Sequence, residues 1–190
     1  MAVAKKHKGT VGIIGLGIMG GAFAKTLAAA GWRVAGYDIS AARRREAQRA
    51  GVEIAKNAAG VAAKAPTILA SLPKPQALID TARAIAKAKL KPKVVVEMST
   101  FAISDKEKAR ALLAKAGHTM LDVPVSGTGA QAAKRDIVFY ASGDRRAISK
   151  LKPMFDAFGR HLYEVGEFVT VAPAAATGLV FAGVRFHTVT

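Results

Sequence analysis

Residues 11–21 have the sequence VGIIGLGIMGG, an apolar run that ends in a G-x-G-x-x-G turn, and an alanine-rich pattern follows up to Gly31. In such a turn the first glycine permits a sharp bend, the second lets a diphosphate approach the backbone, and the third lets a helix pack against the strand. The free N–H groups and the positive dipole end of that helix attract the anion. The stretch therefore predicts a strand, a turn and a helix that hold a nucleotide diphosphate, with contacts from Gly15, Leu16, Gly17, Ile18, Met19 and Gly20.

An acid follows the next predicted strand. Residues 34–37 form that strand, and Asp38 comes directly after it. A carboxylate at this place accepts hydrogen bonds from the adenosine ribose of a dinucleotide and repels a 2′-phosphate, so it favours NAD over NADP. Residues 43–45 are three arginines that are able to reach a phosphate, which keeps NADP open. The other interpretation of these arginines is a solvated helix face.

Composition excludes several classes of protein. A length of 190 residues allows one domain of ordinary size. The chain has no cysteine, which excludes disulfides, thiolate metal sites and cysteine nucleophiles and fits a reducing, cytoplasmic location. The basic residues 1–8 lead into no apolar signal core, and no stretch approaches the roughly 20 apolar residues that span a membrane. No metal site is predicted, because His118 and His161 lack a partner at ligand spacing.

The charge balance is strongly basic, with 29 Lys+Arg against 13 Asp+Glu and a net charge of +16. These cations are spread over several predicted helices, and no strand with interleaved aromatic residues accompanies them. Solvated helix faces, together with attraction for an anionic cofactor and a small carboxylate substrate, account for this pattern. We therefore expect no specific nucleic-acid partner.

Strands and helices alternate along most of the chain, which predicts an α/β fold of the Rossmann type: a doubly wound, mainly parallel sheet with helices on both faces. The expected organisation is a basic arm over residues 1–10, one domain over 11–167 and an irregular tail over 168–190. Helices are expected over 41–50, 58–63 and 75–88, from a capping box at 104–107 to Gly117, and from Asp144 to Gly159. Strands are expected over 52–54, 67–72, 94–98, 120–123, 137–141 and 161–165.

Two pairs of residues fall at the carboxyl ends of predicted parallel strands, where open α/β sheets bind their ligands. They are Leu72-Pro73 and Ser99-Thr100. Strand termination and turn formation explain the same residues equally well. A further strand leads into residues 122–129, a small-residue loop whose hydroxyl and N–H groups could hold a carboxylate, although a plain turn has the same composition.

Four segments together resemble the β-hydroxyacid dehydrogenases, the 3-hydroxyisobutyrate dehydrogenase-like family that is related to 6-phosphogluconate dehydrogenase. They are GLGIMG at 15–20, LP at 72–73, ST at 99–100 and DVPVSG at 122–127, and they have the order and spacing of that family. The resemblance extends from about Gly12 to Phe168.

The resemblance implies an NAD(P)-binding Rossmann domain and reversible hydride transfer between nicotinamide and a small hydroxy acid or semialdehyde. It implies that Leu72, Pro73 and Thr100 lie along the nicotinamide end of the cofactor. It also implies that Ser126 and Gly127 hold the substrate carboxylate, with Thr128 in place of a second glycine of this loop.

One element of the family pattern has no counterpart. The family's catalytic lysine, which acts as general acid and base, would fall near Ala175, but no lysine follows Lys152. We therefore expect no catalytic residue of this kind in the chain and little or no turnover. A frameshift after Phe168 would explain the motif-free tail and the missing C-terminal domain. The alternative functions are a non-catalytic dinucleotide-binding module and a basic scaffold. A missing partner domain would expose apolar surface, through which we expect association into a homo-oligomer.

Overall fold

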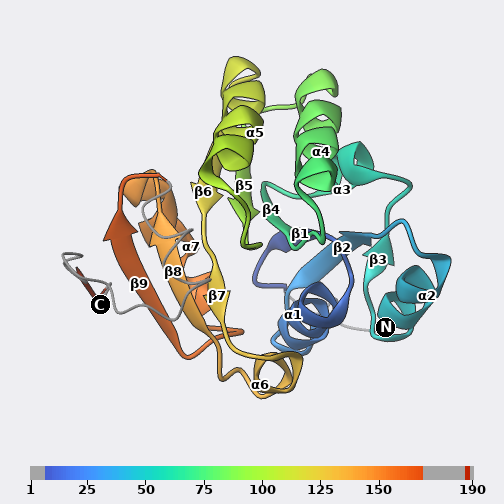
Figure 1. Ribbon diagram of the computed structural model, residues 1–190. Coiled ribbons are helices and arrows are strands. Elements are labelled where there is room, and N and C mark those ends of the chain that lie inside the picture. The colour runs from blue at the N-terminus through green and yellow to red at the C-terminus, as the bar shows by residue number, and fades with distance from the viewer. Residues whose placement is uncertain (1–6, 169–186, 189–190) are drawn as a thin grey trace.

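The computed structural model describes residues 7–168 and the backbone of residues 187–188, which form one mixed ten-stranded sheet with helices packed against it (Figure 1). The order across the sheet is β10-β9-β8-β6-β5-β4-β1-β2-β3, and β7 pairs with β8. The strands are β1 (Thr10–Ile14), β2 (Arg33–Tyr37), β3 (Glu53–Ile54), β4 (Thr67–Ala70), β5 (Val94–Glu97), β6 (Thr119–Asp122), β7 (Val125–Ser126), β8 (Val138–Ser142), β9 (His161–Gly166) and β10 (His187–Thr188).

The sheet divides into two parts by strand direction. From β3 to β6 all pairings are parallel, as apolar strands separated by helices predict. Strand β8 runs antiparallel to β6, and β9 is parallel to β8. The expectation of a mainly parallel, doubly wound sheet is confirmed, and the reversal occurs where the alternation of the sequence changes.

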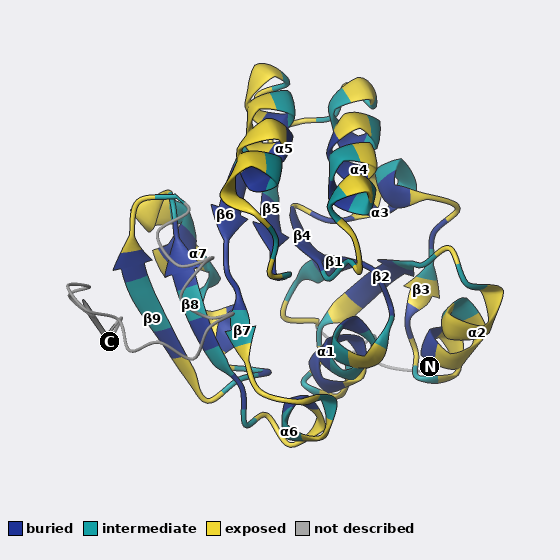
Figure 2. Cartoon of the chain, in the orientation of Figure 1, coloured by how far each residue is buried: buried dark blue, intermediate teal, exposed yellow. Residues whose placement is uncertain are grey.

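Helices cover both faces of the sheet. They are α1 (Ile18–Ala29), α2 (Ala41–Arg49), α3 (Ala58–Lys64), α4 (Pro75–Lys87), α5 (Ile103–Lys115), α6 (Gly129–Ala133) and α7 (Arg145–Phe155). One layer contains α3, α4 and α5 and packs on residues such as Ile68 and Val95. The other contains α1, α2, α6 and α7, and there Phe23 packs against Phe139 and Phe158. Buried residues fill the central strands β1, β4, β5 and β6 between the layers, whereas β3, β7 and β9 are largely intermediate or exposed (Figure 2).

Several helix boundaries follow from local capping. The side chains of Ser40, Asn57 and Asp144 accept a backbone N–H at the starts of α2, α3 and α7, as their positions in the sequence predict. The expected capping box at 104–107 is wrong, because α5 begins earlier, after Ala102, and has no side-chain cap. Lys106, the third residue of the expected box, instead meets two buried carboxylates.

Three other elements differ from expectation. Strand β4 ends at Ala70, and α7 ends at Phe155, so both elements are shorter than the apolar pattern predicts. Helix α6 begins at the end of the loop expected over 122–129, where the sequence predicts no helix. Of the irregular tail, the structure describes Phe168 and the two-residue strand β10, and Ala175 lies outside the described residues.

Candidate functional site

The glycine-rich turn joins β1 to α1 at the carboxyl edge of the parallel strands, and two of its glycines are fixed by close packing. Gly15 has a φ of +89°, and a Cβ there would lie 2.0 Å from the carbonyl oxygen of Ser71. A Cβ at Gly20 would lie 1.9 Å from the carbonyl oxygen of Gly15. Neither position has room for a side chain, so these glycines bring the start of α1 against the sheet.

Gly17, the second glycine of the motif, has a different surrounding. A Cβ at this position would meet no heavy atom within 4 Å, and its φ of −67° is open to any residue. Helix geometry leaves the N–H groups of Ile18, Met19 and Gly20 without an acceptor inside α1. No side chain caps this end, and its first turn contains no acid. The start of α1 is therefore open and electropositive, which suits a diphosphate.

Asp38 lies at the end of β2 and is bonded to this turn. The N–H of Leu16 donates to Asp38 Oδ2 at 2.7 Å, and the N–H of Ser40 donates to Asp38 Oδ1 at 2.8 Å. The carboxylate is half-buried, and each of its oxygens has a further lone pair for another donor. The structure thus brings the predicted ribose acid next to the predicted diphosphate turn.

The arginines after Asp38 have different positions. Arg44 Nη1 donates to the carbonyl oxygens of Asp38 and Ile39 at 2.6 and 3.0 Å, and its guanidinium lies over the ring of Tyr37. Arg44 therefore holds the backbone of the turn. Arg43 lies on α2 and reaches Glu46, with 4.0 Å between Nη1 and Oε2. This ion pair is half exposed and weak.

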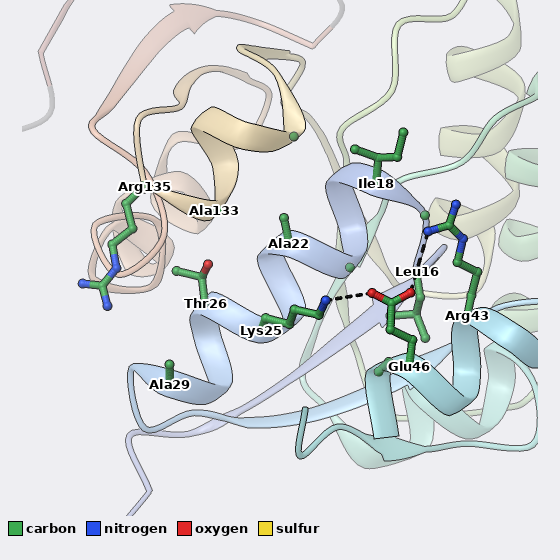
Figure 3. A pocket seen from close by; sticks show the side chains of 14 residues that line it. Leu16, Ile18, Ala22, Lys25, Thr26, Ala29, Arg43, Glu46, Ala133 and Arg135 are labelled. Atoms are coloured by element: carbon green, nitrogen blue, oxygen red, sulfur yellow. Dashed lines mark hydrogen bonds and ion pairs between the residues drawn. The ribbon is translucent and has the colours of Figure 1, made fainter. Parts of the chain in front are cut away.

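A groove of about 450 Å³ runs along α1 beside the glycine turn. Its walls come from α1, α2 and α6, and in Figure 3 Lys25 and Arg43 both point toward Glu46. The groove shares Leu16, Gly17 and Ile18 with the predicted cofactor turn. Asp38 and the strand-end residues lie outside its lining, so the groove flanks the proposed dinucleotide path.

The predicted nicotinamide-end residues lie around the same edge of the sheet. The N–H of Leu72 donates to Ser99 Oγ at 2.9 Å, which links the turns that follow β4 and β5. The side chain of Leu72 also lies beside Gly15, with its Cδ2 3.4 Å from the Cβ position of that glycine. Pro73 and Thr100 are exposed.

The loop after β6 meets the start of α1. A Cβ at Gly129 would lie 2.3 Å from Cγ2 of Ile18, so the loop packs directly on the glycine turn. Ser126 and Gly127 are exposed, and Gly127 has a φ of +140°. Thr128 caps α6 in a capping box with Gln131, so its hydroxyl already has a local partner. Sequence reasoning missed this box, although T-x-x-Q is its usual pattern.

Sequence reasoning also missed a buried cluster beneath these turns, which we name the Lys106 triad. It consists of Lys106, Glu97 and Asp122, whose side chains are all 0% exposed. Lys106 Nζ lies 2.5 Å from Asp122 Oδ1 and 3.0 Å from Glu97 Oε2. It also donates to the carbonyl oxygen of Ser99 at 2.8 Å. The signal was available, because Lys106 shares a helix face with the apolar Ala109 and Leu113.

The triad contains two acids and one cation. Burial raises the pKa of Glu97 and of Asp122, and the nearby Lys106 ammonium opposes that rise in both. Within the described residues, Asp122 Oδ2 is buried without a hydrogen-bond partner. The N–H of Ser99 donates to Glu97 Oε1 at 2.7 Å, so the triad holds the Ser99–Thr100 turn from two sides.

His118 is buried at the opposite edge of the sheet. Its Nδ1 accepts the N–H of Lys93 at 3.2 Å, and only 4% of the residue is exposed. Burial and the nearby Lys93 charge lower the pKa of His118. The prediction of a structural histidine therefore fits these contacts.

We expect His118→Asn to reduce the loss of stability below neutral pH. A folded-state pKa below the unfolded value near 6.5 means that the unfolded chain binds the proton first. The wild-type free energy of unfolding should thus fall as pH decreases through about 6.5, whereas the asparagine, which keeps an acceptor near the Nδ1 position, should not titrate. Denaturant unfolding between pH 7.5 and 5 measures this, with the exposed His161→Asn as control. Parallel curves for wild type and His118→Asn would contradict the assignment.

Within the described residues, no helix is long and apolar enough to cross a bilayer. The same residues contain no group of three or more side chains suited to a metal ion.

Comparison with known proteins places these features in a family. The family model described as the NAD binding domain of 6-phosphogluconate dehydrogenase matches residues 10–166. NAD-dependent L-serine dehydrogenase of Pseudomonas aeruginosa is 32% identical over 161 residues, which cover 82% of this chain and 53% of that protein. L-threonate dehydrogenase of Haemophilus influenzae is 30% identical over 162 residues, covering 83% of this chain and 54% of that protein. The chain thus spans about half the length of these relatives.

Solved structures agree with this assignment. A structure of Mycobacterium tuberculosis 3-hydroxyisobutyrate dehydrogenase with L-serine has a TM-score of 0.80 and 25% identity, over 84% of this chain and 55% of that one. An imine reductase from Myxococcus stipitatus in complex with NAD⁺ has a TM-score of 0.79 at 19% identity, over 89% of this chain and 58% of that one, and shows the shared fold. The chain belongs to the family of the NAD-binding domain of 6-phosphogluconate dehydrogenase, whose relatives include the 3-hydroxyisobutyrate, L-threonate and L-serine dehydrogenases.

Proposed function

We propose that this domain binds NAD for hydride transfer between the nicotinamide and a small hydroxy acid or semialdehyde. The observation that carries the proposal is the start of α1, where free N–H groups, the open space at Gly17 and the Asp38 carboxylate adjoin one another. A diphosphate at this helix end and a ribose at Asp38 would use each of these groups. The names of the dehydrogenase relatives support the reaction class.

The other binding roles fall to residues that follow the carboxyl ends of the strands. We assign the nicotinamide end of the cofactor to Leu72, Pro73 and Thr100, which border the same sheet edge as the glycine turn. The exposed Ser126 and Gly127 would hold the substrate carboxylate. The capping box of Thr128 supports a role in shaping this loop. Nicotinamide supplies the hydride acceptor or donor, and these residues would position the reacting carbon against it.

NAD should bind more tightly than NADP, because the Asp38 carboxylate repels a 2′-phosphate. In the Asp38→Asn variant, NAD affinity should fall by about tenfold and the NAD/NADP affinity ratio by at least as much, since charged hydrogen bonds contribute about 1.5–3 kcal/mol. Calorimetric titration with both dinucleotides measures these ratios. The exposed Asp156→Asn is the control for loss of one acid. Tighter binding of NADP to the wild type would refute the assignment.

A second candidate function is a dinucleotide-binding module without turnover. It is favoured by the absence of lysine after Lys152, where the family pattern expects the general acid and base. Lys106 does not replace it, because its side chain is fully buried and bonded to protein oxygens. A hydride-transfer assay over short hydroxy acids separates the two candidates: binding without turnover supports the module, whereas robust turnover shows that another group moves the proton.

A further inference from the structure

The charges of the Lys106 triad do not balance. Two carboxylates share one ammonium, and the three side chains are 0% exposed. When all three are ionised, the cluster carries one excess negative charge away from water. When one carboxyl is protonated, the cluster is neutral. Burial favours the neutral form, in agreement with the raised pKa values of Glu97 and Asp122.

The triad lies under the turns assigned to the nicotinamide end. Glu97 accepts the N–H of Ser99, and Lys106 donates to its carbonyl oxygen, directly before Thr100. Ser99 in turn accepts the N–H of Leu72. Asp122 ends β6, shortly before the short strand β7 that contains Ser126. The excess charge therefore sits at the part of the sheet edge where the oxidised cofactor would carry its positive ring.

The ionisable groups that face one another here come from three elements. Helix α5 contributes Lys106, β5 contributes Glu97 and β6 contributes Asp122. From β8 the hydroxyl of Ser142 donates to the carbonyl oxygen of Asp122 at 3.3 Å. The turn after β4 contributes the backbone N–H of Leu72 through Ser99. Among the described residues, the charge of the cluster is thus set by one lysine and two acids.

We propose that the Lys106 triad is a charge sensor for the redox state of the cofactor, with Glu97 as the residue that makes it favour NAD⁺ over NADH. The proposal rests on the dinucleotide site proposed above. The ionised triad attracts the positively charged nicotinamide ring of NAD⁺. The ring of NADH is neutral, so the charge of the triad adds nothing to NADH affinity. Binding of NAD⁺ consequently releases a proton from the triad to solvent, and binding of NADH does not.

The expected signature is a pH-dependent preference. The ratio of NAD⁺ affinity to NADH affinity should rise by about fivefold from pH 5 to pH 9. An effect of this size is expected when one negative charge near the protein surface attracts the positive nicotinamide ring. The ratio rises with pH because deprotonation makes the cluster negative. Affinities are measured by NADH fluorescence and by competition with NAD⁺ on the full 190-residue chain.

Glu97→Gln tests the assignment, because it keeps the shape and leaves the neutral pair of Lys106 and Asp122. In this variant the ratio should be flat across the same pH range and lower than in the wild type at high pH. Glu107→Gln removes the same charge from the exposed face of α5, the helix that carries Lys106, and should retain the wild-type profile. A purely structural role of Glu97 would weaken both cofactors equally and leave the ratio unchanged, which would overturn the proposal.

A second measurement needs no variant. Calorimetry of NAD⁺ binding in two buffers with different ionisation enthalpies, repeated across the same pH range, should show release of a fraction of one proton, and NADH binding should show none. Equal proton release for both cofactors, or none for either, would overturn the sensor while leaving dinucleotide binding intact. A wild-type chain that binds neither cofactor would refute the proposed function as well.

Discussion

Gly17→Ala should weaken NAD binding by about a hundredfold and lower the free energy of unfolding by less than about 1 kcal/mol. The stability effect is small because a Cβ at Gly17 meets nothing within 4 Å and the backbone φ of −67° suits any residue. The binding effect is large because that empty space is where a diphosphate must approach the N–H groups of α1. A single added methyl group should therefore change NAD affinity while leaving the stability of the turn nearly unchanged.

Two glycines serve as matched controls for this experiment. Gly60→Ala adds a methyl group inside α3, with its nearest neighbour at 3.4 Å, and should leave NAD affinity unchanged while adding up to about 1 kcal/mol of stability. Gly20→Ala should instead unfold the turn, since its Cβ would lie 1.9 Å from the carbonyl oxygen of Gly15. Calorimetric titration and denaturant unfolding measure the two effects. Wild-type NAD affinity in Gly17→Ala would show that the dinucleotide does not pass this point.

The sequence predicts the parts of the fold that depend on local pattern. Residues 11–21 specify β1, the turn and the start of α1, because glycine spacing and an apolar run leave few other conformations. Caps such as Ser40 and Asn57 act on their own helix, so their effect is visible in a few residues. The proximity of the turn at Gly15–Gly20 to the strand ends follows from parallel pairing, which places the carboxyl ends of neighbouring strands at one edge.

The missed features depend on contacts between distant segments. Lys106 reaches Glu97 and Asp122, which are 9 and 16 residues away, and no local pattern at 104–107 encodes that contact. Helix α6 is five residues long, too short for apolar periodicity, and its position depends on packing against α1. Roles in ligand binding are harder still to predict from sequence, because they depend on a molecule that the chain alone does not specify.

Lys106→Met should lower the free energy of unfolding at neutral pH by about 3–5 kcal/mol, the cost of leaving buried charges without their partner. Methionine matches lysine in length, so the change removes the ammonium and little volume. Glu97 and Asp122 would then face each other's charge without a cation between them, although both side chains are fully buried. The exposed Lys108→Met, on the same helix, removes an equal charge and should change stability by less than about 1 kcal/mol.

The pH dependence distinguishes lost charge pairing from lost packing. Without Lys106, the folded-state pKa of both carboxyls should rise further above the unfolded values near 4. An acid with a raised folded-state pKa stabilises the fold below its unfolded pKa and loses that contribution as pH increases. The deficit of Lys106→Met should therefore be small near pH 4 and large at pH 8, and Glu97→Gln in the same chain should recover part of it. A deficit that is constant with pH would assign the effect to packing, because methionine contacts do not titrate.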